Sequence, residues 1–350
     1  MIMLGLCGAI FLYEVGIKAL QQDISFQFYA DSITYYRSLE SASREFLHLK
    51  DMVQFSRNFL GPWLILELTQ SNYYAVLGLN VLIFWVAVEI ISTSLGARRR
   101  FLYVLLLANP ITLSSLLSVN KEIISLFVIA GLLYGLRKKN FWILCGIAMI
   151  GFFVRWQLSL FCLLTIFVFS RFNILKPYRW RTCIVLLLLA SIVLTALDQT
   201  IKSFNGFNIA EQMYEGSGFF QMLIDAQEYG LYWLTFVPKS LHLLFGLGLR
   251  LDRLASPEDL YNDVWQLLHS LAMLFVFVLL LINRRLKIRS DLLFISLLYL
   301  LVFAATPIYV PRYFYPIYVM WAACLAVPSV VFSSKNKIMH SDLHTSGLTA

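Results

Sequence analysis

Apolar runs of about twenty residues recur along nearly the whole chain, and this repetition limits the possible folds more than any other feature. Each run is long enough to cross about 30 Å of hydrocarbon as a helix. Hydrophobic residues make up 59% of the 350 residues and charged residues 14%, whereas soluble domains carry roughly 25% charged residues. The sequence therefore predicts an integral membrane protein of the all-α class.

The basic residues lie between the apolar runs and indicate an orientation. The formal net charge of +8 could suggest a nucleic-acid partner, but basic clusters that separate apolar runs are typical of membrane proteins, so no nucleic acid is expected. The positive-inside rule places one series of connections in the cytoplasm. This series comprises residues 97–100, 137–139, 171–181, 283–289 and 333–337.

The alternation of these clusters with apolar runs predicts a polytopic transmembrane helix bundle of about ten spans, with both termini cytoplasmic. The first run could instead be a signal peptide, but Glu14 and Lys18 within it argue against that interpretation. Residues 1–332 form the predicted transmembrane domain, and residues 333–350 a disordered cytoplasmic tail. The predicted spans are Met1–Leu20, Tyr73–Leu95, Phe101–Val119, Glu122–Leu136, Phe141–Val154, Trp156–Ser170, Cys183–Leu197, Trp265–Ile282, Leu292–Ile308 and Phe314–Val331.

Two outward-facing connections are long enough to form structure of their own. The first covers residues 21–72, with helical patterning over residues 38–49 and an amphipathic stretch, GPWLILELT. The second covers residues 198–263 and contains aromatic and apolar stretches too short to span. We expect both loops to carry short interfacial helices and to form an outward-facing chamber.

Two charges, Lys121 and Glu122, interrupt the apolar stretch from Leu106 to Gly135. A charge near the bilayer core is costly unless it is paired or hydrated, so we expect both residues at an outward helix junction. One interpretation is a plain hairpin tip, capped by Asn120, with a mutual ion pair. The interpretation we favour is an ammonium group that binds a lipid phosphate while Glu122 aligns it, because no further turn residues flank the tip.

Arg155 lies in the middle of an apolar stretch between two cytoplasmic clusters, so two short helices must meet near it. At 1.5 Å per residue each helix reaches only about 20 Å, which places Arg155 below the outer surface. A guanidinium at that depth needs a partner or a path to water. The alternatives are a bidentate phosphate, a structural carboxylate such as Glu89 or Glu14, and snorkelling toward the interface.

Arg312 lies between prolines and tyrosines in TPIYVPRYFYP. The tyrosines fit an aromatic belt, but the arginine breaks the positive-inside pattern at the face that also carries Lys121 and Arg155. Three cations at one outer face predict a site for a polyanionic headgroup, such as a pyrophosphate or a phosphate ester.

Asp31 offers a carboxylate just beyond the first predicted span. It could deprotonate an attacking sugar hydroxyl, or it could simply cap the helix that begins in SITYYRSLE, which is the commoner role for a loop aspartate. Tyr35, four residues later, provides a hydroxyl that could bind sugar or phosphate. Glu40 and Glu211, with Glu122, are weaker acidic alternatives.

The order of these features resembles the C-type superfamily of glycosyltransferases that use polyprenyl-phosphate-linked sugars, such as the protein mannosyltransferases and the lipid A aminoarabinose transferases. The shared pattern is an aspartate in the first outward loop before a tyrosine-bearing helix, GPW before the second span, Asn80 within that span, and NP and NKE around an outward hairpin. The NP and NKE residues are Asn109, Pro110, Asn120, Lys121 and Glu122. The pattern covers roughly the first half of the chain.

The resemblance implies a transmembrane catalytic domain at the periplasmic or outer face of a bacterial inner membrane. The implied partners are membrane lipids, a donor sugar linked to polyprenyl phosphate or pyrophosphate, and a glycan or lipid acceptor. Asp31 would be the base or acceptor-orienting group, and Lys121, Arg155 and Arg312 would hold the donor phosphate. No cofactor is expected, and a divalent metal stays open because no dense carboxylate cluster argues for one.

Two alternatives to a single-sugar transferase stay open. The size of the chain and its outward arginines also resemble O-antigen and exopolysaccharide polymerases, which join lipid-linked repeat units. A transporter or flippase of lipid-linked oligosaccharides would also need intramembrane cations, although the internal repeat typical of such proteins is not visible in the sequence.

Overall fold

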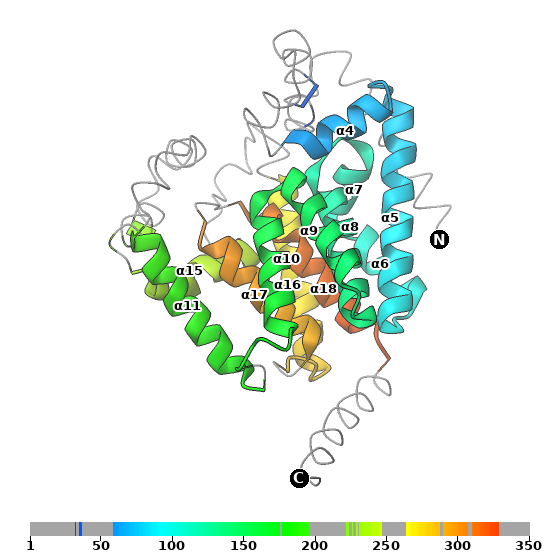
Figure 1. Ribbon diagram of the computed structural model, residues 1–350. Coiled ribbons are helices and arrows are strands. Elements are labelled where there is room, and N and C mark those ends of the chain that lie inside the picture. Colours follow the sequence, from blue (N-terminus) through cyan, green and yellow to red (C-terminus); the bar gives the residue numbers. More distant parts are fainter. Residues whose placement is uncertain are drawn as a thin grey trace.

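The computed structural model describes residues 59–175, 177–196, 231–246, 264–287, 290–306 and 310–328, with single positions at 32, 35, 36, 222, 223, 226 and 229. Within these residues every regular element is a helix and no strand occurs, so the predicted all-α class is confirmed (Figure 1). The helices are α4 (Leu60–Leu68), α5 (Tyr73–Leu95), α6 (Arg99–Leu107), α7 (Pro110–Leu117), α8 (Lys121–Lys138), α9 (Phe141–Val154), α10 (Trp156–Phe169), α11 (Arg179–Ala196), α15 (Tyr232–Phe245), α16 (Gln266–Ile282), α17 (Asp291–Ala304), η4 (Pro311–Phe314) and α18 (Tyr315–Ala326).

Most predicted spans coincide with one helix. Tyr73–Leu95 and Phe141–Val154 have the predicted bounds, because Asn72 and Asn140 cap the two helices from just outside the apolar runs. The amphipathic stretch GPWLILELT forms α4, as predicted. The first predicted span, Met1–Leu20, lies outside the described residues.

The predicted span Phe101–Val119 is not one continuous helix. The chain forms α6 and α7 instead, and the two helices meet at an angle of 83°. Pro110 has no N–H to donate and occupies the first position of α7, while the Asn109 side chain accepts a hydrogen bond from the backbone N–H of Ile111 at 2.9 Å. This proline and cap end α6 and restart the helix in a new direction.

Helix length does not support ten full-length spans. Among the described residues, only α5 is by itself both long and apolar enough to cross a bilayer, and α6 with α7 would qualify as a bent pair. The apolar helices α9, α10 and α17 have 14 residues each, which corresponds to about 21 Å.

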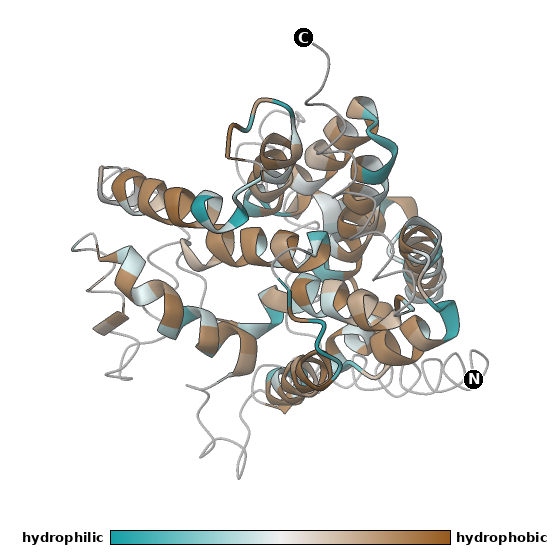
Figure 2. Ribbon diagram, turned by 90° about the horizontal axis from the view of Figure 1, so that it is seen from below, coloured by the Kyte–Doolittle hydropathy of each residue, from teal (hydrophilic) through white to brown (hydrophobic). Residues whose placement is uncertain are grey.

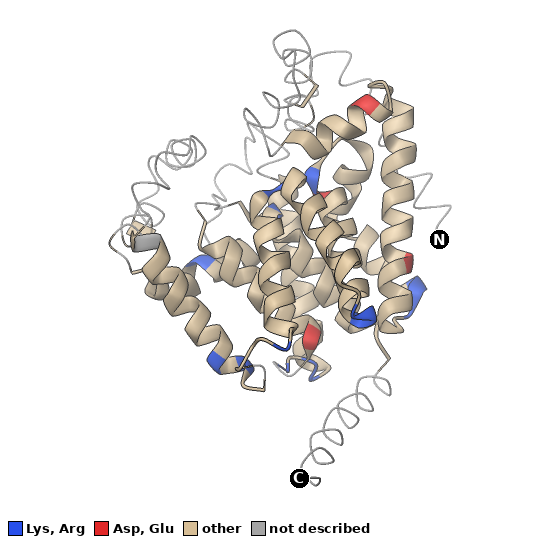
Figure 3. Cartoon of the chain, viewed as in Figure 1, with Lys and Arg blue, Asp and Glu red and all other residues tan. Residues whose placement is uncertain are grey.

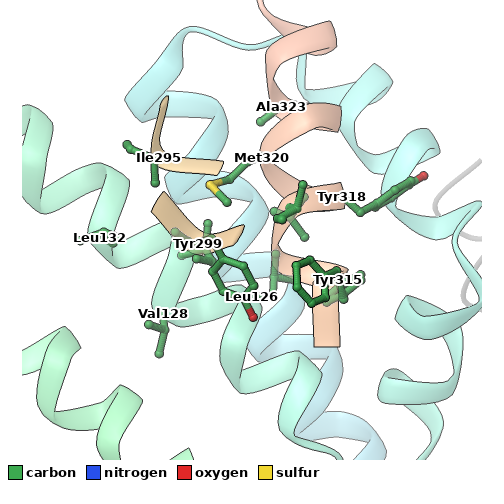
Figure 4. Packing of buried hydrophobic residues seen from close by; sticks show 14 of the residues in the cluster. Leu126, Val128, Leu132, Ile295, Tyr299, Tyr315, Tyr318, Met320 and Ala323 are labelled. Carbon is green, nitrogen blue, oxygen red and sulfur yellow. The ribbon is translucent and has the colours of Figure 1, made fainter. Parts of the chain in front are cut away.

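The centre of the bundle is α18, whose 12 residues are all buried. A helix that is apolar on every side is stable only when other helices surround it. Figure 4 shows how α18 packs between α8, which contributes Leu126 and Leu132, and α17, which contributes Ile295 and Tyr299. This central packing fixes the start of α18, and therefore the preceding turn η4, against the start of α8.

Small residues allow α8, α9 and α10 to approach closely. A Cβ atom at Gly131 would lie 2.3 Å from Cδ1 of Ile147, and one at Gly151 would lie 3.2 Å from the backbone N of Ser159. The close approach of α9 and α10 at Gly151 brings the turn between them, at Arg155, into the interior.

Most of the described basic residues outside the junctions at Lys121, Arg155 and Arg312 gather at one end of the bundle. Figure 3 shows lysine and arginine where α5 leads into α6, α8 into α9, α10 into α11 and α16 into α17. The junctions between α7 and α8 and between α9 and α10 lie at the opposite end (Figure 1).

Candidate functional site

The junction of α7 and α8 places two charged residues in the interior. Asn120 is the N-cap of α8, and its side chain accepts a hydrogen bond from the backbone N–H of Glu122 at 3.4 Å. Lys121 is only 8% exposed and Glu122 is fully buried. The interpretation as a water-exposed hairpin tip therefore does not fit, because the bundle covers both side chains.

The partner of Glu122 comes from the turn between α9 and α10. Arg155 Nη2 lies 2.5 Å from Glu122 Oε1, and Arg155 is buried. Of the two carboxylates that the sequence suggested for Arg155, Glu89 instead binds Arg99 at 2.8 Å, and Glu14 lies outside the described residues. The buried pair thus joins two turns that are 33 residues apart in the chain.

Two helices begin at this ion pair. Lys121 and Glu122 are the first two residues of α8, and Arg155 is the N-cap residue of α10. The unpaired N–H groups at a helix start give it a partial positive charge and favour an anion there. Glu122 supplies one negative charge at this position, and a phosphate group would be favoured for the same reason.

Tyr313 connects Arg155 with Arg312. The Arg155 guanidinium carbon lies 4.3 Å from the centre of the Tyr313 ring, and that of Arg312 lies 5.5 Å from it. The Tyr299 hydroxyl donates to the backbone carbonyl of Tyr313 at 2.7 Å, which fixes the turn. The aromatic ring lets two guanidinium groups share a neighbourhood despite their like charges.

Lys121 contacts two aromatic residues that belong to the first predicted loop, Tyr35 and Phe59. Its Nζ lies 5.4 Å from the centre of the Tyr35 ring and 4.9 Å from that of Phe59. The two rings pack edge to face, 5.2 Å apart. Tyr35 is buried, while Asp31, the predicted catalytic residue, lies outside the described residues.

Contacts join Glu122, Arg155 and Arg312 through Tyr313, and Lys121, the chain neighbour of Glu122, contacts Tyr35. Five of the six predicted site residues therefore lie in these two connected groups. We call Lys121, Glu122, Arg155, Arg312 and Tyr313 the cationic cluster, and Tyr35 lies beside it. Sequence reasoning missed Tyr313, because tyrosines near a predicted membrane surface are explained by an aromatic belt. Its position directly after Arg312 was the available signal.

The cationic cluster keeps unused hydrogen-bonding capacity. Glu122 Oε2 and Arg155 Nη1 are buried and have no hydrogen-bond partner among the residues that the structure describes. The unfilled Arg155 Nη1 is a charged donor that an oxygen atom of an anion could accept from. Glu122 Oε2 is an acceptor, so it would need a donor such as a hydroxyl group.

A second polar layer lies deeper in the bundle. Asn109 Nδ2 lies 2.9 Å from Nδ1 of His269 in α16, and the Thr112 hydroxyl donates to the Tyr315 hydroxyl at 2.9 Å. All four side chains are buried. Sequence reasoning did not single out His269, because one histidine in an apolar run has no pattern that distinguishes it.

A metal site does not emerge from the described part of the chain, since no group of three or more His, Cys, Asp or Glu side chains is placed there to hold an ion. Comparisons with models of protein families, with curated proteins and with solved structures find no match to this chain.

Proposed function

We propose that this protein is a polytopic membrane glycosyltransferase that uses a sugar linked to polyprenyl phosphate or pyrophosphate, at the outer face of a bacterial inner membrane. The cationic cluster is the proposed site of the donor phosphate. The product would be a cell-surface glycan, and the acceptor a glycan or a lipid. The proposal combines a membrane location, an anion site and a displacement reaction, each with its own support.

The outer surface of the bundle supports the membrane location. Large apolar side chains point outward along α5, α9, α11 and α16, and Trp142 and Ile282 are 81% and 71% exposed. Figure 2 shows apolar ribbon over most of the outer helix faces. Exposed apolar surface of this extent requires a partner such as lipid, and the basic connections at one end fit the positive-inside rule (Figure 3). Helices of about 21 Å would need thinning of the bilayer or flanking interfacial residues.

The single observation that carries the functional proposal is the buried Glu122–Arg155 pair, with Arg155 Nη1 unfilled, at the start of two helices. Ionisable groups inside a membrane domain are costly, and they usually mark a functional site. Arg155 can offer its second nitrogen to a phosphate oxygen, while Lys121 and Arg312 balance the remaining charge.

The proposed reaction is a displacement at the anomeric carbon. The acceptor hydroxyl oxygen forms a bond to that carbon while the bond from the carbon to the phosphate oxygen breaks. The bonding electron pair stays on the departing phosphate, where the cationic cluster stabilises the developing charge. The hydroxyl proton passes to a carboxylate base, for which Asp31 remains the proposed residue.

Polymerisation of lipid-linked repeat units is an alternative with the same chemistry, since its donor also leaves a polyprenyl pyrophosphate. A transporter of lipid-linked oligosaccharides is an alternative from another class. The 83° break between α6 and α7 favours it, because broken helices with buried ions often form transport sites.

A gel profile of surface polysaccharide tests the proposal. Cells that lack the protein are complemented with wild type, Arg155→Met, Asp31→Asn or the control Arg99→Met, whose arginine pairs with Glu89 at the opposite, basic end. We expect Arg99→Met to behave as wild type and the other two variants to fail.

The polysaccharide profile of cells that carry the inactive variants distinguishes the alternative functions. Collapse of a long ladder to single repeat units would indicate a polymerase, and an intact ladder of altered mobility would indicate a single-sugar transferase. Loss of lipid-linked intermediates at the outer face, with full activity of Asp31→Asn, would reject an enzyme in favour of transport. Wild-type profiles from Arg155→Met would remove the basis of the proposed site.

A further inference from the structure

His269 is a fully buried histidine of α16 that the proposed reaction does not use. Its ring lies among aromatic side chains, with the ring centres of Tyr315 and Tyr318 at 6.4 Å and 6.1 Å. A polar ring in such surroundings is costly unless it is hydrogen-bonded. Its hydrogen-bond contacts are with Asn109, which is 160 residues away in the chain, and with the backbone of Pro311, the first residue of η4.

The orientation of the Asn109 amide defines the hydrogen bond between Asn109 and His269. Asn109 Oδ1 accepts from the backbone N–H of Ile111 at 2.9 Å, as the N-cap of α7. Asn109 Oδ1 also lies 3.2 Å from His269 Nδ1. Because this oxygen already accepts from Ile111, we assign the amide nitrogen, Nδ2, at 2.9 Å as the donor to His269 Nδ1. A neutral imidazole with its proton on Nε2 can accept this bond, so one side chain of α16 holds the point where α6 breaks into α7.

A second hydrogen bond fixes α7 one turn further along. Thr112 Oγ1 donates to the Tyr315 hydroxyl at 2.9 Å, and Tyr315 is the first residue of α18. Asn109, the N-cap of α7, and Thr112 within α7 are three residues apart and so lie on the same side of the helix start. That side of α7 is therefore linked to α16 and to α18.

These two bonds connect the elements that carry the two halves of the cationic cluster. After α7 the chain reaches Lys121 and Glu122 within five residues, whereas Tyr315 directly follows η4, which carries Arg312 and Tyr313. Helix α16, which carries His269, also packs against η4. The separation between the start of α8 and η4 thus depends on how α7 is held.

We infer that His269 is a positioning residue of the anion site: through Asn109 it holds α7 so that Lys121 and Glu122 lie at the correct distance from Arg312 for one anion to contact both halves. This inference rests on the proposed function of the cationic cluster as a phosphate site. His269 does not contact the substrate. It affects binding only by positioning the residues of the cationic cluster.

A double-variant cycle tests the inference in the full-length protein, reconstituted in nanodiscs. The probe is farnesyl diphosphate, and its affinity is measured by calorimetry for wild type, His269→Leu, Arg312→Ala and the double variant. We expect His269→Leu to weaken binding roughly tenfold in the wild-type background and by less than about twofold once Arg312 is absent. A purely structural residue would weaken binding by the same factor in both backgrounds, and that result would overturn the inference.

Two further variants keep the test decisive. Ser270→Ala is the matched control, because its buried hydroxyl has no partner among the described residues, and its affinity should equal that of wild type. Thr112→Val removes the second bond with little change of volume, and replaces His269→Leu in the cycle if that variant does not fold. Failure of wild type to bind farnesyl diphosphate would reject the proposed phosphate site. Binding by wild type with unchanged affinity in both His269→Leu and Thr112→Val would reject only the role of His269.

Discussion

The buried ion pair makes a quantitative prediction about stability. Side-chain exposure is 5% for Arg155 and 0% for Glu122, and their charged atoms lie 2.5 Å apart. Replacing one partner leaves the other charge buried without a counter-ion, which costs about 3 to 5 kcal/mol. Replacing both with apolar residues of similar volume is often neutral. We therefore expect Arg155→Met and Glu122→Leu each to destabilise the protein strongly, and the double variant to be within about 1 kcal/mol of wild type.

The chain contains a matched control for this prediction. Arg99 and Glu89 form the same kind of pair at 2.8 Å, but their side chains are 56% and 22% exposed. A pair in such surroundings contributes about 0 to 1 kcal/mol. SDS titration in mixed micelles measures the free energy of unfolding of wild type and of the single and double variants of each pair. The coupling energy of the two pairs is thus compared under one condition. Equal, small coupling in the two pairs would refute the interior placement of Arg155 and Glu122.

Variants at four further positions test the packing around the site and the role of Tyr313. Arg285→Ala should lower the free energy of unfolding by about 1 to 3 kcal/mol, measured by the same titration, because its Nη1 donates to the backbone carbonyls at the end of α18, those of Cys324, Leu325 and Val327. Gly131→Val should cost about 1 to 3 kcal/mol through overpacking against Ile147, whereas Gly146→Ala, with open space around it, should not destabilise. Tyr313→Leu should weaken farnesyl diphosphate binding and Tyr313→Phe should not, because the phenyl ring retains the contact with both guanidinium groups.

The sequence predicts the bounds of individual helices well. It predicts the positions where a helix is interrupted poorly. Tyr73–Leu95 and Phe141–Val154 were predicted with the observed bounds, because a strong apolar run ends where a capping residue stands. Phe101–Val119 was predicted as one helix because its hydropathy is continuous. Pro110 changes the direction of the chain without changing its hydropathy, so a measure of apolar character does not detect it.

The sequence predicts which residues belong to the candidate site, but it does not predict which of them form an ion pair. Lys121, Glu122 and Arg155 stood out because each is a charge inside an apolar stretch. The sequence leaves a phosphate, a structural carboxylate such as Glu89 or Glu14, and snorkelling open for Arg155, whereas the structure pairs it with Glu122. That pairing depends on the packing of α8 against α9 and α10, which no local pattern encodes.

Tyr313 and His269 were missed for a related reason. A tyrosine near a predicted interface and a lone histidine in an apolar run each have an ordinary explanation in the sequence. Their contacts with Arg155 and Asn109 join segments that are far apart in the chain. Only the arrangement of the helices distinguishes these residues from others of their kind.

Native mass spectrometry of the protein extracted from bacterial membranes tests the central claim most directly, because it identifies the lipid that the cationic cluster retains. We predict a bound polyprenyl phosphate or pyrophosphate, with or without its sugar, on wild type and on Arg99→Met. The same adduct should be absent from Arg155→Met/Glu122→Leu, in which the buried pair is replaced without an uncompensated charge. Ordinary phospholipids alone on wild type, or an unchanged polyprenyl adduct on the double variant, would contradict the assignment of the cluster as the donor phosphate site.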